Sequence, residues 1–257
     1  MVEEKMPFTE HLGELRKRII FSLISIVGWF VIIFNYSEKI FQFLTIPLHS
    51  ELSFVYSFPF IQFVPSRAEV QKLVFLGPAE AFWMHIKISM IAALVFSLPV
   101  ILFHVWKFIA PGLLQNEKKY VGPFIIVASL LFVLGTAFCF FIVLPFALGF
   151  LLTYKTGTLM PMLSVGAYTD FCLKFILAFG LVFELPIVIL FLTRIGLITT
   201  QTLRKNRKYA LLIAFILAAI LTPTPDAFNQ SLMAVPILIL YEVGIIVSRI
   251  FPARRTE

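Results

Sequence analysis

Long runs of apolar residues, separated by short polar segments, dominate the chain. One helix needs roughly 20 apolar residues to cross a bilayer. Six runs reach or approach that length, at about residues 19–36, 81–105, 121–152, 169–193, 209–222 and 227–248. The pattern therefore predicts an all-α polytopic membrane protein with six transmembrane helices.

Proline positions indicate that these helices are bent, because proline lacks the N–H that a regular helix uses. Five prolines lie within or at the ends of the runs: Pro99, Pro123, Pro145, Pro186 and Pro236. The last two runs look short, since the 13 residues from Tyr209 to Leu221 span about 20 Å of a hydrocarbon core about 30 Å thick. We expect a cupped bundle of kinked helices with two short C-terminal spans.

The segments outside these runs complete a single membrane domain, residues 1–257. Residues 1–18 predict a short amphipathic helix on the cytosolic surface, because Leu12, Leu15 and Ile19 recur at helical spacing. Four prolines interrupt residues 37–80, and no stretch between them reaches spanning length. We expect an irregular, partly helical external cap there.

The distribution of basic residues predicts the orientation. Fifteen of the 21 Lys and Arg residues lie in the two termini and in the second and fourth loops, whereas four lie in the other three loops. By the positive-inside rule, both termini are therefore cytoplasmic. This topology, together with anionic lipid at the inner surface, accounts for the net charge of +7 without a nucleic-acid partner.

Familiar catalytic and cofactor motifs are absent from the sequence. It contains no GxxxxGK[ST], GxGxxG, HExxH or GxSxG pattern. Its four histidines and two cysteines lack the spacing of metal ligands. We therefore expect neither an enzyme nor a bound cofactor or metal ion, and we interpret Cys139 and Cys172 as small buried apolar residues.

One carboxylate interrupts an apolar run, in AFGLVFELPIVILFL at residues 178–192. An ionisable group at mid-membrane costs on the order of 2.5 to 3.5 kcal/mol and is functional by default. Pro186 bends the helix beside Glu184 and opens a polar notch. In this notch the Glu184 carboxyl group either serves a function or is protonated and forms a hydrogen bond between helices. Water, Lys87 or Lys174 could also be its hydrogen-bonding or ionic partner.

Two further glutamates lie in predicted cytosolic segments. Glu14 shares a helix face with Glu10, four residues earlier, and Glu117 lies in an otherwise basic loop. Each glutamate either binds a cationic ligand or pairs weakly with its basic neighbours.

Four segments resemble one known family in their order along the chain. They read HLGELRKR at 11–18, LPVILFHVWKFIAPGLLQNEKK at 98–119, FGLVFELPIV at 179–188 and LTPTPDAFNQSLMAVP at 221–236. The sequence is similar to the TatC family, the C subunit of the twin-arginine protein translocase. The resemblance implies a non-enzymatic receptor core, in the bacterial cytoplasmic (inner) membrane, for the export of folded proteins by the proton-motive force.

The resemblance also assigns roles to residues. The signal-peptide-binding positions are Glu14, Glu117, Arg16, Phe108 and Leu113. A carboxylate accepts an arginine fork through two parallel hydrogen bonds, a geometry that lysine cannot reproduce.

Further positions follow from the same matching. Glu184 corresponds to a glutamate in a concave, membrane-facing groove, and four polar or proline positions affect function or partner docking: Thr222, Asp226, Gln230 and Pro47. Asp226 is alternatively the N-cap of the last helix. The implied partners are twin-arginine signal peptides, single-span subunits of the TatA and TatB types in a hetero-oligomer, and the lipid bilayer.

A proton- or ion-coupled transporter of small solutes is the alternative function, with Glu184 as the carrier carboxylate. Such a transporter predicts inverted repeats and a closed site at the membrane midplane. The sequence shows no internal repeat. An intramembrane hydrolase is a third hypothesis, but no nucleophile and base are arranged for it.

Overall fold

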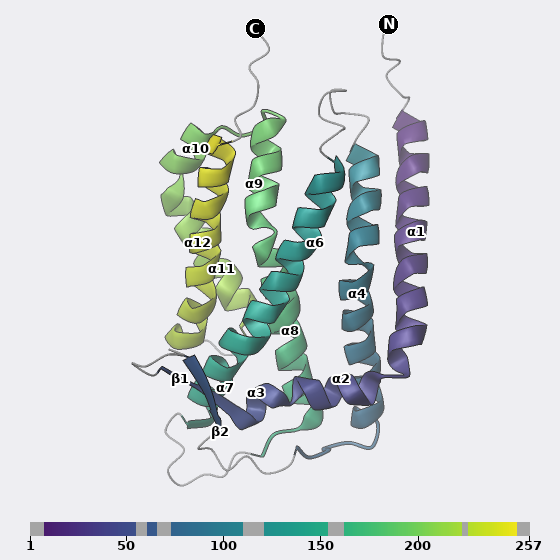
Figure 1. The fold of residues 1–257 in the computed structure, drawn as a ribbon, viewed down its shortest axis with the longest axis vertical. Coiled ribbons are helices and arrows are strands. Elements are labelled where there is room, and N and C mark those ends of the chain that lie inside the picture. Colours follow the sequence, from purple (N-terminus) through teal and green to yellow (C-terminus); the bar gives the residue numbers. More distant parts are fainter. Residues whose placement is uncertain are drawn as a thin grey trace, which may run out of the picture.

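The computed structural model describes residues 8–54, 61–65, 73–109, 121–153, 162–222 and 226–250. Long helices make up most of this part of the chain (Figure 1). They are α1 (Phe8–Phe34), α4 (Glu80–Ile109), α6 (Val121–Phe138), α8 (Val165–Phe183), α9 (Leu185–Arg194), α11 (Arg207–Leu221) and α12 (Ala227–Ile250). The shorter elements are α2 (Ser37–Leu44), α3 (Ile46–His49), the π-helical turn η2 (Cys139–Val143), α7 (Leu144–Thr153), α10 (Thr200–Lys205), β1 (Ser50–Phe54) and β2 (Ile61–Pro65).

The described residues contain five helical stretches that are long and apolar enough to cross a membrane, which confirms a polytopic membrane protein. α8 with α9 forms one stretch, and α6, η2 and α7 form another. The 15 residues of α11, at the fifth predicted run, reach about 22 Å. The prediction of two short final spans holds for α11. It is wrong for α12, because the 24 residues of this helix reach about 36 Å. Pro236 lies inside α12 and does not end it.

The N-terminus differs from its prediction. Residues 8–18 do not form a separate surface helix, because α1 runs without interruption from Phe8 to Phe34. Gly13 is the only glycine in the first turns, and one glycine costs only about 1 kcal/mol in a long helix. The polar N-terminal turns thus continue the first span as one helix.

Two interruptions shape the middle of the chain. The break predicted near Pro186 is present, because α8 ends at Phe183 and α9 begins at Leu185, with Pro186 in the first turn of α9. The third apolar run contains η2 between α6 and α7. Such π-helical turns are rare, and they shift the face that later residues present.

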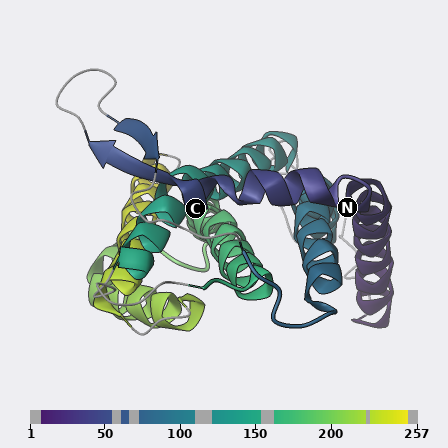
Figure 2. The ribbon, with the colours of Figure 1, turned by 90° about the horizontal axis from the view of Figure 1, so that it is seen from below.

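The long helices stand side by side in a curved row, with α1 and α4 at one end and α11 and α12 at the other (Figure 2). α1 begins and α12 ends at the same end of the molecule (Figure 1). At the opposite end, α2 and α3 lie across the long helices, and β1 pairs with β2 in antiparallel register from Ser50 opposite Pro65 to Phe54 opposite Ile61. The predicted cap therefore contains a regular hairpin.

The carboxylate of Glu80, which the sequence analysis did not predict as important, anchors this cap through hydrogen bonds. The Oε1 atom of Glu80, the first residue of α4, accepts hydrogen bonds from the Ser164 hydroxyl and the Gly166 N–H (2.7 Å), and Oε2 accepts from the Leu76 N–H (2.6 Å). Val74 pairs with the same segment, because its carbonyl accepts from the Val165 N–H at 3.0 Å. These bonds tie the chain before α4 to the start of α8.

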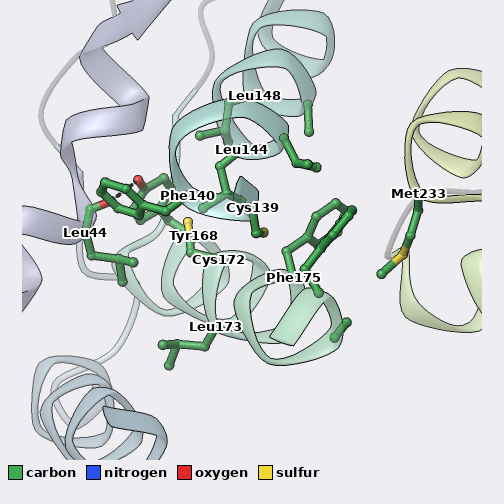
Figure 3. Close-up of a cluster of buried hydrophobic side chains, with 14 of the residues drawn as sticks. Leu44, Cys139, Phe140, Leu144, Leu148, Tyr168, Cys172, Leu173, Phe175 and Met233 are labelled. Atoms are coloured by element: carbon green, nitrogen blue, oxygen red, sulfur yellow. Dashed lines mark hydrogen bonds between the residues drawn. The ribbon is translucent and has the colours of Figure 1, made fainter. Parts of the chain in front are cut away.

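The core surrounds α8 (Figure 3). Its contacts with α6 are close: a Cβ atom on Gly180 would lie 2.6 Å from the Phe132 ring. The Tyr168 hydroxyl donates to the Leu44 carbonyl at 2.6 Å, which joins α8 to α2. Cys139 and Cys172 are fully buried free thiols in this core, as predicted.

Candidate functional site

Glu14 lies in the second turn of α1 and is already paired. Its Oε1 atom accepts a hydrogen bond from Nη2 of Arg18 at 2.7 Å, and both side chains are about one-fifth exposed. The two residues meet because positions four apart share a helix face. Arg16 is exposed on another side of the helix. Of the two alternatives for Glu14, the ion pair is therefore present, and it leaves the carboxylate accessible.

The contacts between α1 and α4 fix where Glu14 lies. The Phe21 ring stacks on His104, with 5.5 Å between ring centroids, and Trp29 stacks on Phe96 at 5.2 Å. Trp29 follows Phe21 by eight residues on α1, whereas its partner on α4 precedes His104 by eight residues. The two stacked pairs therefore belong to one antiparallel register. Continued toward the N-terminus of α1, this register places Glu14 about one turn beyond Lys107 and level with the end of α4.

The other predicted signal-peptide positions are only partly described. Phe108 is partly buried in the last turn of α4. Leu113 and Glu117 lie outside the described residues. Because α4 ends at Ile109, Glu14 lies next to the point from which the segment with Leu113 and Glu117 continues.

Glu184 occupies the break between α8 and α9. It is the C-cap residue of α8 and the N-cap residue of α9, and its side chain is partly buried. Its Oε1 atom is shielded from solvent and has no hydrogen-bond donor among the described residues. Lys87 is not its partner, because the Lys87 Nζ atom binds both carboxylate oxygens of Asp170, at 2.7 and 2.9 Å.

Asp170 and Glu184 share one side of α8. Asp170, Lys174, Leu177, Leu181 and Glu184 follow one another at intervals of three or four residues, so they form one helix face. We call these five residues the polar face of α8. It extends over about 21 Å, and the exposed side chains of Lys174 and Leu181 show that it lies open.

A third group of predicted residues gathers where α11 and α12 meet. The Asp226 Oδ1 atom accepts from the Asn229 N–H at 2.7 Å, so Asp226 caps α12, as one alternative predicted. The Gln230 side chain donates to the Phe215 carbonyl at 3.1 Å, and the buried Thr222 hydroxyl donates to the Ala218 carbonyl at 2.8 Å. The bond from Gln230 joins α12 to α11 at the cap end, and the other two bonds stabilise the end of α11 and the start of α12.

Pro47 is buried in the short helix α3, also at the cap end. A proline fits the first turn of a helix, because the N–H it lacks would have no helical partner there. The structure therefore does not bring all the predicted residues together. Glu14, Arg16 and Phe108 lie at one end and Glu184 lies in the middle, whereas four residues lie at the opposite end: Pro47, Thr222, Asp226 and Gln230.

A family model matches most of the chain. The model described as "Sec-independent protein translocase protein (TatC)" matches residues 10–236. The chain belongs to the TatC family. This family consists of translocase components and not of enzymes, and membership argues against the small-solute transporter.

Two relatives and one solved structure illustrate the similarity. The TatC protein of Carboxydothermus hydrogenoformans is 43% identical over 97% of this chain and 95% of its own length. The TatC protein of Desulforapulum autotrophicum is 41% identical over 98% of this chain and 88% of its own length. A crystal structure titled "Twin Arginine Translocase Receptor- TatC in DDM" is 39% identical, with a TM-score of 0.78 over 93% of this chain and 99% of that one.

Within this TatC-family chain, sequence reasoning missed Glu80 and the pair of Lys87 with Asp170. A signal existed for Asp170, because its position four residues before Lys174 and 14 before Glu184 shows one helix face. No local pattern indicated that Lys87, on another helix, would bind it.

Proposed function

We propose that this protein is the signal-peptide receptor core of a twin-arginine translocase, which exports folded proteins across the bacterial cytoplasmic membrane. Membership of the TatC family carries this proposal. Solved structures of similar fold are titled twin arginine translocase receptors. The family resemblance implies the proton-motive force as the energy source, and the chain has no recognisable nucleotide-binding motif that would argue for ATP instead.

The proposed orientation places the first turns of α1 and the end of α12 in the cytoplasm. Basic residues gather at this end: Arg16, Lys17 and Arg18 in α1, Arg204 and Lys205 in α10, and Arg249 in α12. Such clusters remain on the cytoplasmic side. Signal peptides, which are made in the cytoplasm, would therefore meet Glu14.

Recognition of the arginine pair would take place at Glu14 and Glu117. This role is supported by the ion pair that Glu14 already forms with an arginine, the Arg18 guanidinium at 2.7 Å. A signal arginine would displace Arg18 and form two parallel hydrogen bonds, whereas a lysine offers a single point charge. Arg18 thus competes with the ligand for Glu14.

Long-range attraction does not explain the binding, because the basic cytoplasmic rim repels a cationic peptide. Short-range hydrogen bonds must be combined with burial of the apolar part of the peptide among the helices. Phe108, Leu113 and Arg16 would complete this contact surface. The same requirement explains why a receptor for a basic peptide is itself embedded in the membrane.

Glu184 and the cap-end residues would serve partner subunits. A buried carboxylate oxygen without a donor among the described residues is costly in a membrane. A polar side chain on the single helix of a TatA- or TatB-type subunit would supply the missing hydrogen bond. Thr222, Asp226, Gln230 and Pro47 would keep the cap end in the shape that such subunits contact.

The proposal is tested by binding of a signal peptide to the detergent-solubilised protein. An Arg-Arg peptide should bind about tenfold more tightly than its Lys-Lys form, because charge-assisted hydrogen bonds contribute about 1.5 to 3 kcal/mol each. The double variant Glu14→Gln/Glu117→Gln should lose this preference.

The matched control is Glu38→Gln, which removes an exposed carboxylate from α2 at the opposite end. This variant should keep the full preference. If the double variant still prefers the Arg-Arg peptide, Glu14 and Glu117 are not the recognition site. If the unmodified protein binds both peptides equally, the receptor function itself is wrong.

A further inference from the structure

A cavity of about 520 Å³ lies between α6, α9 and α12, at the end of the molecule where α9 and α12 end. All but one of the described residues that line it are apolar, and Arg194, the last residue of α9, is the exception. Two side chains from each helix define its walls: Phe124, Val127, Ile187, Leu190, Val243 and Val247. We call this cavity the Arg194 groove.

The walls of the Arg194 groove are held by packing behind them. The Trp106 ring contacts both Phe124 and Phe191 edge to face, with centroid distances of 4.7 and 4.8 Å. On the other side α12 approaches α9 closely, because a Cβ atom on Gly244 would lie 2.7 Å from Ile189. The groove is therefore preformed, as ligand sites usually are.

The depth of the groove matches one leaflet. It extends from Arg194, at the end of α9, to Pro186, a distance of about 12 Å along the helix. One leaflet contributes about half of a hydrocarbon core about 30 Å thick. The groove therefore begins at the membrane surface and ends near the bilayer centre.

The length of the groove favours a lipid chain over a partner helix. A spanning helix would continue past Pro186, where the groove ends. An acyl chain is thinner, and it ends at the bilayer centre.

The charges at the mouth select the headgroup. Arg194 offers a fork that matches phosphate geometry, and four more basic residues lie at the same end: Arg204, Lys205, Lys208 and Arg249. Arg207 is also there, but Glu242 pairs with it at 2.6 Å. Basic clusters at a membrane surface attract anionic lipid. We propose that the Arg194 groove binds an anionic phospholipid, with one acyl chain between α6, α9 and α12 and the phosphate at Arg194. This inference is independent of the receptor function.

Native mass spectrometry of the purified full-length protein tests the headgroup. Phosphatidylglycerol and phosphatidylcholine with identical acyl chains are the two probes. The protein should retain phosphatidylglycerol preferentially, and Arg194→Gln should lower that retention about fivefold, the contribution of one basic residue near a membrane surface. Arg204→Gln is the matched control, because Arg204 is basic and lies at the same end but does not line the groove.

Equal retention of the two lipids, or equal losses in Arg194→Gln and Arg204→Gln, would overturn the proposal in favour of diffuse surface attraction. The acyl chain is tested separately with Val243→Trp, which fills the groove, and with Val235→Trp, on an exposed part of the same helix. Only the former should reduce bound lipid, and unchanged binding in Val243→Trp contradicts the site.

A photoreactive benzophenone amino acid at position 243 identifies the occupant in native membranes. The expected adduct has the mass increase of one phospholipid. An adduct with a protein chain would overturn the lipid assignment and show that a partner subunit lies on the groove.

Discussion

The helices α1 and α8 are both long and apolar, but they are held very differently. In the apolar window of α1 only 6% of the residues are buried inside the protein, compared with 50% for the stretch that contains α8. α1 packs mainly against α4 through its aromatic stacks, whereas α8 contacts α4, α6 and the cap. The proposed binding residues on α1 can therefore adjust at little cost, whereas the residues of α8 are fixed by the core.

The largest expected effect is a loss of thermal stability when a glycine of α8 that packs against α6 receives a side chain. A glycine of α1 with no close neighbour provides the comparison. Gly180→Val should overpack the contact of α8 with Phe132 and lower stability by about 2 kcal/mol, which shifts the Tm by about 4 to 8 °C. Gly28→Val in α1 is the control, because nothing lies within 4 Å of its added Cβ. Thermal unfolding in detergent measures both, and equal shifts would abolish the contrast between the helices.

The second largest effect is expected at the hydrogen-bonded junction between the cap and the start of α8. Glu80→Gln replaces a carboxylate that accepts three hydrogen bonds, so it should weaken the junction between the cap and α8, by less than the overpacking at Gly180. Hydrogen exchange should increase at the start of α8, and α1 should not change. Increased exchange throughout the protein would indicate that Glu80 supports the whole fold and not only this junction.

Glu184 tests the polar face of α8 as a contact for partners. Glu184→Gln should preserve association with a single-span subunit, whereas Glu184→Leu should weaken it by about 1 kcal/mol, the size of a polar contact between membrane helices. Co-purification with the partner measures this difference. Equal behaviour of the two variants would mean that no polar contact is made at this position.

The smallest expected effect concerns Arg18. Arg18→Gln frees the Glu14 carboxylate from an ion pair that contributes about 0.3 to 0.5 kcal/mol, so an Arg-Arg signal peptide should bind about twofold more tightly. Lys17→Gln changes the net charge equally without touching Glu14, and it corrects for the reduced repulsion. Weaker binding in Arg18→Gln would show instead that Arg18 holds Glu14 in position.

The sequence predicts the features that depend on local patterns. Apolar runs place the long helices, Pro186 predicts the break beside Glu184, and an aspartate before an apolar run predicts the cap of α12. A local pattern does not show whether two adjacent helical segments join, which is why the continuity of α1 through residues 8–18 was missed.

Features that depend on distant residues were not predictable. Glu80 and Ser164 are 84 positions apart, and Lys87 and Asp170 are 83 apart. A single sequence shows each of these side chains only as an isolated polar residue. The same limit applies to the Arg194 groove, since three separate segments of the chain form it.

The π-helical turn η2 determines where the fold tolerates the loss of one residue. A π turn contains one residue more than a regular turn, so it rotates everything after it by about 100°. That rotation lets the buried residues of α6 and α7 line one side of a single stretch: Ala128, Phe132, Gly135, Leu144, Ala147 and Leu148. Deleting one residue within Cys139–Val143 would produce an ordinary helix with the same side buried, whereas one deletion in the middle of α8 would turn its second half out of the core.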